Sequence, residues 1–160
     1  MVVVEKASSL NLVKDLLDES LAVAETNLDQ YAEEPSIKRR LDQCVVQFKE
    51  LKGVLKIVNL QGASLLAEEM EALANVILET DDSNQERLLA GLSNGIVIMG
   101  HYLGYVHKRQ GTLPVLLIPT INEVRSLAKK PFLPESTFFR LPSNPDRPIK
   151  QSGCLFYTSE

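Results

Sequence analysis

One run of apolar residues constrains the fold of this chain more than any other feature. Between positions 41 and 58 the apolar side chains recur at alternating steps of three and four residues, at Leu41, Cys44, Phe48, Leu51, Leu55 and Val58. This spacing places all of them on one face of an α-helix. A helix with one such face buries it against other helices. The segment therefore predicts a helical bundle.

Similar helical spacing continues through most of the chain. We predict a first helix over about residues 9–33, a second that begins at Pro35 or Ser36 and ends near Asn59, a third that holds residues 66–77 and stops before Thr80, and a fourth that holds residues 88–106. Short connections between four long helices favour an antiparallel bundle. The expected fold class is all-α.

Several residues mark the expected helix boundaries. Gly62 marks a junction between the second and third helices, and Asp82 or Ser83 is a ready N-cap for the fourth. Two cations followed by Gly111 close the fourth helix, as a helix C-terminus prefers.

The chain changes character after the fourth helix. Thr112-Leu113-Pro114 begins a further helical segment, which Pro119 must kink or divide. From Pro131 onward the prolines exclude a regular helix, and four apolar residues are expected to pack back on the bundle: Phe132, Leu133, Phe138 and Phe139. We therefore predict a helical bundle with an additional C-terminal helix over residues 8–130, and a Pro-rich extended segment with a flexible tail over residues 131–160.

Composition narrows the functional classes. A chain of 160 residues is long enough for one domain with a sizeable core. Its net charge of -4 and its pI near 5.3 argue against nucleic-acid binding, which needs a basic face. Cys44 lies on the apolar stripe and is expected to be a buried free thiol in a reducing compartment. The first residues are charged too soon for a secretion signal, so a cytoplasmic location is the default expectation.

Three lysines share one face of the second predicted helix. Lys49, Lys52 and Lys56 recur at i, i+3 and i+7, on a stripe rotated away from the apolar positions. One interpretation is an ordinary solvated face, and the other is a docking surface for an acidic partner. Gly53 favours the second, because a glycine inside a helix costs roughly 1 kcal/mol relative to alanine and suggests that another backbone or a partner comes close.

Other polar residues give weaker indications of chemistry. His101 and His107, the only histidines, lie six residues apart and point to different sides of a helix, so they do not form a metal-binding pair. Glu68, Glu69 and Glu71 are expected to form a solvated acidic face. The chain has no glycine-rich phosphate loop, nucleophile elbow or zinc-type cysteine pair. We therefore expect no catalytic residue, no metal and no cofactor.

A membrane-spanning helix is the weaker alternative for residues 88–106. This stretch has no formally charged side chain and contains two glycine pairs at small-xxx-small spacing. Ser93, Asn94 and His101 weaken that hypothesis, and the amphipathic neighbours need a bundle partner. We expect no direct insertion into a membrane, with the glycines permitting close helix packing.

The segment Phe48-Lys49-Glu50-Leu51-Lys52-Gly53 resembles the phospho-acceptor segment of histidine phosphotransfer (HPt) domains, where a histidine is followed three residues later by Lys and then Gly. Here Lys52 and Gly53 stand in the Lys-Gly positions, and Lys49 stands in the histidine position. An imidazole accepts and passes on a phosphoryl group, whereas a protonated amine has no lone pair to attack with. The resemblance implies an HPt-like bundle that is not an enzyme.

Further segments narrow this resemblance. Residues 51–71, 113–125 and 133–139 resemble the HPt-like N-terminal regions of bacterial proteins in the chemotaxis-like system that controls type IV pili and twitching motility. The resemblance spans about residues 8–140. It implies a scaffold or regulator of this two-component signalling, within a longer chain, whose partners are a polar scaffold protein or a response-regulator receiver domain. It also implies recruitment to the cell pole.

Two alternatives stay open at this point. One is an active phosphotransfer domain of a chemotaxis-like histidine kinase that uses His101 or His107 in place of Lys49. The other is a structural role in which the bundle forms a homodimer. Under the leading hypothesis the partner-binding residues are Lys49, Lys52, Gly53 and Lys56.

Overall fold

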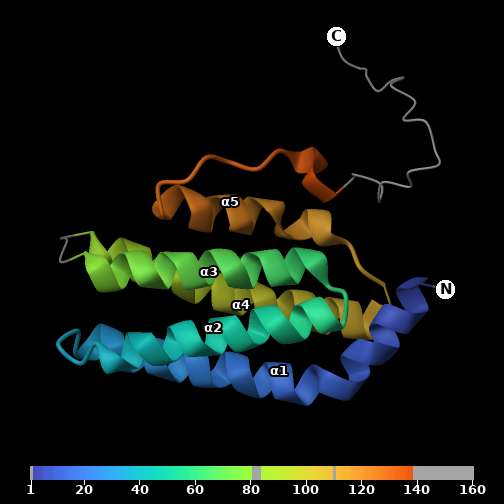
Figure 1. The fold of residues 1–160 in the computed structure, drawn as a ribbon, viewed down its shortest axis with the longest axis horizontal. Helices are drawn as coiled ribbons and strands as arrows, with labels where there is room; N and C mark the ends of the chain where they lie inside the picture. The colour runs from blue at the N-terminus through green and yellow to red at the C-terminus, as the bar shows by residue number, and fades with distance from the viewer. Residues whose placement is uncertain (1, 81–83, 110, 139–160) are drawn as a thin grey trace, which may run out of the picture.

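The computed structural model of the chain describes residues 2–80, 84–109 and 111–138. It consists of α1 (Val2–Glu33), α2 (Arg39–Ile57), α3 (Gln61–Glu79), α4 (Gln85–Arg109), the 3-10 helix η1 (Pro114–Leu117), α5 (Ile118–Leu127) and the 3-10 helix η2 (Glu135–Phe138) (Figure 1). These described residues contain no β-strand, so the predicted all-α class is confirmed.

The long helices pack around one apolar core. Each of α1 to α3 packs against the next helix, and α4 packs back against α1, so the four form a closed ring of neighbours. The shorter α5 lies on α3 and α4, on the side that faces away from α1 and α2 (Figure 1). As a result α3 packs against α2, α4, α5 and η1, and it is the most enclosed helix of the fold.

The apolar stripe from which the bundle was predicted is buried along its whole length. On this stripe the Cys44 Sγ lies 3.3 Å from the backbone oxygen of Ala24 in α1 and donates to it. Burial raises the pKa of the Cys44 thiol to about 12, so the thiol is neutral and fills space in the core. The predicted buried free thiol is confirmed; its compartment stays a prediction.

A left-handed residue ends α2 where the sequence predicted. Asn59 has a φ of 66°, a conformation that asparagine tolerates better than most residues. The next N–H, of Leu60, donates to the Leu55 oxygen at 2.8 Å and closes the last turn. The chain then enters α3 at once, so Gly62 lies inside the first turn of α3 and is not a junction.

Two predicted helix starts were wrong. The first helix begins at Val2, well before residue 9. The second begins at Arg39, because Pro35 and Ser36 belong to a turn in which the Ile37 N–H donates to the Glu34 oxygen at 3.1 Å. The predicted N-cap residues 82 and 83 lie outside the described residues. The predicted division at Pro119 is confirmed, since this proline occupies the first turn of α5 directly after η1.

A buried carboxylate holds α5 on α3. Only 2% of Glu69 is exposed. The Arg125 guanidinium of α5 donates to its Oε2, and the Lys130 ammonium donates to its Oε1 at 2.9 Å. The expected solvated acidic face is therefore wrong for Glu69, because α5 and the turn that follows it cover this carboxylate and supply its two cations.

The segment after α5 turns back along it. The Leu133 N–H donates to Asn122 Oδ1 at 2.7 Å, and Asn122 Nδ2 donates to the Leu133 oxygen at 3.1 Å. Leu133 and Phe138 pack against the core, as predicted. The same prediction is wrong for Phe132, which is 69% exposed, and Phe139 lies outside the described residues. The predicted boundary at 130/131 stays a prediction.

Within the described residues, no helix is long and apolar enough to cross a membrane. The predicted close packing is confirmed for Gly91 and Gly95 of α4 and is wrong for Gly100 and Gly104, where an added Cβ would meet no atom within 4 Å. A Cβ at Gly95 would lie 2.7 Å from the Met70 sulfur of α3, and one at Gly91 would overlap the Leu127 side chain of α5.

We predict that Gly62→Ala destabilises the fold. A Cβ at this position would lie 2.7 Å from Cβ and 3.2 Å from Cα of Pro114, so η1 must move. The cost should be about 1–3 kcal/mol, which exceeds the gain in helix propensity of about 1 kcal/mol. Urea denaturation followed by circular dichroism measures it, and an unchanged or higher midpoint would contradict the packing described.

Candidate functional site

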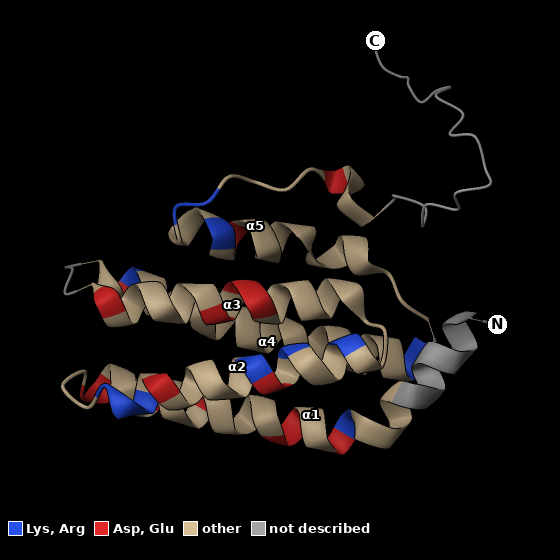
Figure 2. Ribbon diagram, in the orientation of Figure 1, with Lys and Arg blue, Asp and Glu red and all other residues tan. Residues whose placement is uncertain are grey.

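The structure brings the four predicted site residues together on one outward side of α2. We call Lys49, Lys52, Gly53 and Lys56 the basic face. Because the apolar stripe of α2 points into the core, Lys49, Gly53 and Lys56 are exposed and Lys52 is half-buried at the border with α3. The lysines of α2 stand out as a blue group on this helix in Figure 2.

Glu71 of α3 neutralises part of the basic face. Its Oε1 lies 3.2 Å from Lys52 Nζ, and its Oε2 lies 3.9 Å from Lys49 Nζ. The Glu71 and Lys52 side chains are 15% and 28% exposed, whereas that of Lys49 is 62% exposed, so the second pair is well screened by water. The expected solvated acidic face is wrong for Glu71 too, and Glu68 is the member of the trio that is exposed.

Lys52 is the positioned member of the basic face. Besides its ion pair, its backbone oxygen accepts a hydrogen bond from Ser64 Oγ at 3.1 Å, which ties this turn of α2 to α3. Lys56 makes no ion pair with any residue that the structure describes. The role of Glu71 could not be predicted from the residue pattern of α2, because Glu71 lies on another helix, 19 residues from Lys52.

Packing does not explain Gly53. The residue is exposed, and a Cβ added there would meet no atom within 4 Å. The approach of another part of the described chain is therefore excluded as the reason for this glycine. The approach of a partner stays a prediction.

The two histidines lie away from the basic face. His101 and His107 are both exposed on α4, which occupies the corner of the helix ring diagonal to α2 (Figure 1). Among the described residues, no group of three or more His, Cys, Asp or Glu side chains is placed to hold a metal ion.

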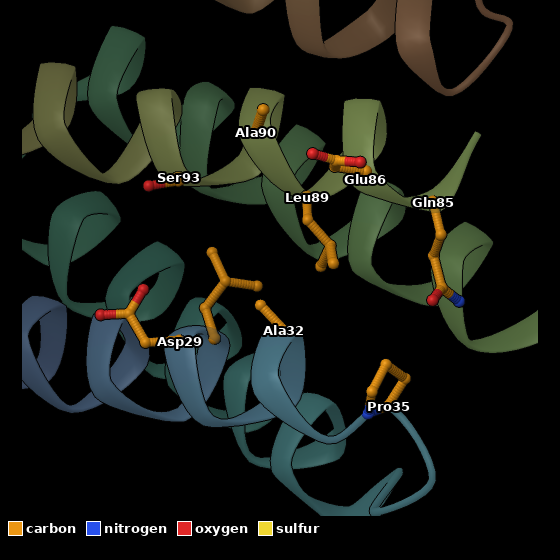
Figure 3. Close-up of a pocket in the computed structure, with 9 residues that line it drawn as sticks. Asp29, Ala32, Pro35, Gln85, Glu86, Leu89, Ala90 and Ser93 are labelled. Atoms are coloured by element: carbon orange, nitrogen blue, oxygen red, sulfur yellow. The ribbon is translucent and has the colours of Figure 1, made fainter. Parts of the chain in front are cut away.

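A groove between α1 and α4 was not anticipated from the sequence (Figure 3). Its lining is apolar or small, with two carboxylates: Leu28, Asp29, Ala32, Pro35, Gln85, Glu86, Leu89, Ala90 and Ser93. Gln85 is held in place, because its Nε2 donates to the Tyr31 hydroxyl at 3.1 Å and to the Thr80 oxygen at 3.2 Å. The lining contains no histidine, cysteine or lysine.

Fold and site together define a class: an all-helical bundle with an outward basic face and, among the described residues, no assembled metal-binding group. Over 133 residues, or 83% of its length, the chain is 38% identical to the scaffold protein FimL of Pseudomonas aeruginosa. The chain is a FimL-like protein, as its sequence motifs predicted.

The aligned part amounts to 24% of FimL, so the activity and partners of that whole protein are matters for proposal. No family model and no solved structure matches the chain. The same sequence segments also resemble the HPt-like N-terminal domain of ChpA, a relationship that stays a prediction.

We predict that Gly53→Ala stabilises the fold. The new methyl group meets open space, and alanine is the better helix former. The free energy of unfolding should rise by about 0.5–1 kcal/mol. Urea denaturation beside Gly62→Ala provides the comparison, and a loss of stability would show that the fold itself needs this glycine.

Proposed function

We propose that this chain is a non-catalytic scaffold module, an antiparallel four-helix HPt-like bundle that binds other proteins through its basic face. The observation that carries the proposal is Lys49. It stands where an HPt domain has its phospho-acceptor histidine, its side chain is 62% exposed, and the following Lys52 and Gly53 share the same outward side. The arrangement keeps an accessible surface and lacks the imidazole that phosphoryl transfer requires.

Charge identifies the kind of partner. Two exposed ammonium groups, Lys49 and Lys56, flank a position without a side chain, Gly53. A carboxylate-bearing surface fits there, because it gains two ion pairs and its backbone approaches closely at the glycine. A response-regulator receiver domain or an acidic region of a polar scaffold protein has this chemistry. The name of FimL as a scaffold protein supports a binding role.

The family resemblance supplies the setting of the proposal. We place the module in the regulation of type IV pili, twitching motility and the associated chemotaxis-like signalling, in the cytoplasm and with recruitment to the cell pole.

We predict that the double variant Lys49→Glu/Lys56→Glu loses its protein partners. Lys52 is left intact, because a carboxylate there would face Glu71 at close range. Tagged chains are recovered from the native cell and bound proteins are quantified by mass spectrometry, with at least about a tenfold loss expected.

The matched control is Arg87→Glu/Lys108→Glu, which changes the net charge equally at two exposed positions of α4. It should keep the partners. If both variants recover the same proteins as the natural chain, the basic face is only solvated surface. A separate variant, Gly53→Leu, tests whether the backbone of a partner approaches closely at this position, since it changes no charge.

We also predict that the chain accepts no phosphoryl group. It is incubated with a receiver domain carrying labelled phosphoaspartate, and an HPt domain with its histidine serves as the positive control. No acid-labile label should appear, because a protonated Lys49 is not a nucleophile. Label that disappears in a His101→Gln or His107→Gln variant would support the alternative of an active phosphotransfer domain.

A further inference from the structure

A second set of apolar side chains, distinct from the buried stripe of α2, is exposed on the outer side of α1 and α2, opposite the side that α5 covers. We call this set the exposed stripe. Leu12, Leu16 and Val23 recur at i, i+4 and i+11 on α1, with exposures of 87%, 53% and 39%. Val46 and Ile57, at i and i+11 on α2, are 44% and 83% exposed. Leu12 and Ile57 are the two most exposed large apolar side chains in the described structure. Such a grouping on one side marks an interaction surface.

Helix geometry places both halves of the stripe on the same side of the molecule. Ala32 of α1 faces α4 in the groove of Figure 3. Around the axis of α1, the exposed apolar residues are rotated from Ala32 by more than a quarter of a turn, so they lie on the side of α1 that is next to α2. On α2 it lies about a third of a turn from Lys52, which faces α3, so it lies toward α1.

The two most exposed residues of the stripe, Leu12 and Ile57, also lie at the same level along the helix axes. Cys44 and Ala24 are in contact, which fixes how the antiparallel α1 and α2 are aligned (Figure 1). Leu12 precedes Ala24 by twelve residues and Ile57 follows Cys44 by thirteen. At about 1.5 Å per residue, both side chains therefore lie at nearly the same level of the helix pair.

The stripe has an acidic border and a basic border. Asp15 and Glu19 are exposed on α1, on the side of the stripe away from α2. Lys49 and Lys56 are exposed on α2, on the side away from α1. The helices as wholes repeat this asymmetry: residues 10–33 carry six acidic and one basic side chain, and α2 carries five basic and two acidic ones (Figure 2).

We propose that the occupant of this face is a second copy of the chain. A partner surface of a single sign would be repelled at one border. A second copy, turned about a two-fold axis parallel to the helices, lays its α1 over α2 of the first, so each acidic border meets a basic border and the apolar stripes meet at the centre. The contact is isologous, and each residue of it is used twice.

This dimer shares Lys49 and Lys56 with the proposed partner binding. The stripe residues Leu12 and Ile57 belong to the dimer alone. An acidic partner and a second copy therefore compete for the basic border.

The first test is the mass of the purified 160-residue chain, from light scattering and sedimentation over about 5–500 µM. A dimer that dissociates on dilution is expected. Leu12→Ser and Ile57→Ser should each raise its dissociation constant by at least about tenfold, because each change acts at two places. Leu116→Ser and Phe132→Ser are matched controls and should change nothing, because both residues are at least 50% exposed. They belong to η1 and to the segment after α5, which lie on the α5 side of the molecule, away from α1 and α2 (Figure 1).

Charge exchange provides the second test. Asp15→Lys/Glu19→Lys makes both borders basic, and Lys49→Glu/Lys56→Glu makes both acidic, so neither variant should pair with itself. An equal mixture of the two should form a heterodimer, because each basic border then meets an acidic one. Formation of the heterodimer would also show that both variants are folded.

Three results would overturn the proposal. They are a chain that stays monomeric at the highest concentration, a dimer that the controls weaken as much as Leu12→Ser does, and charge variants that fail to pair when mixed although circular dichroism shows them to be folded.

Discussion

The buried charge of Glu69 determines how the last third of the described chain is arranged. A carboxylate with 2% exposure needs charged partners, because the loss of its hydration is otherwise uncompensated. Both partners lie more than fifty residues later in the chain: Arg125 in the last turn of α5, and Lys130 just after this helix ends. The pair therefore requires α5 to lie on α3. Arg125 Nε also donates to the Pro131 oxygen at 2.7 Å, so the same cation directs the chain as it leaves α5.

The position of α5 decides which surfaces remain available for binding. It covers the side formed by α3 and α4, where Gly91 of α4 permits the close approach of Leu127 of α5, and Gly62 of α3 permits the close approach of Pro114 of η1. The outer side of α1 and α2 is left uncovered, as is the border between α2 and α3 where Lys52 meets Glu71. The basic face and the exposed stripe are both on these open sides. The two proposed binding surfaces therefore both lie on the first half of the chain, away from α5.

Much of the fold was predictable from the sequence, because helical periodicity depends on neighbours within a few turns. The stripe of α2, its end at Asn59 and the break at Pro119 are of this local kind. The errors share a different cause. Glu69 and Glu71 lie on a helix that the sequence shows as acidic on one side, and only contacts with distant segments bury them. Phe132 shows the opposite error: it is an apolar residue that was expected to pack on the bundle, and the turn after α5 leaves it exposed to water.

The candidate site was predicted from residue types and their spacing, and the structure shows that these residues differ in their contacts. Lys49, Lys52 and Lys56 looked equivalent by spacing, yet Lys52 is held by Glu71 and Ser64 while Lys56 points into solvent. Gly62 was predicted at a junction and Gly53 inside a helix, yet both lie within helices. A neighbouring proline requires Gly62, and nothing in the described chain requires Gly53. Gly100 and Gly104 of α4 meet open space in the same way, so the cost of a glycine to its helix does not by itself identify a binding surface. What distinguishes Gly53 is its position between the exposed Lys49 and Lys56, and this position links it to the proposed partner surface.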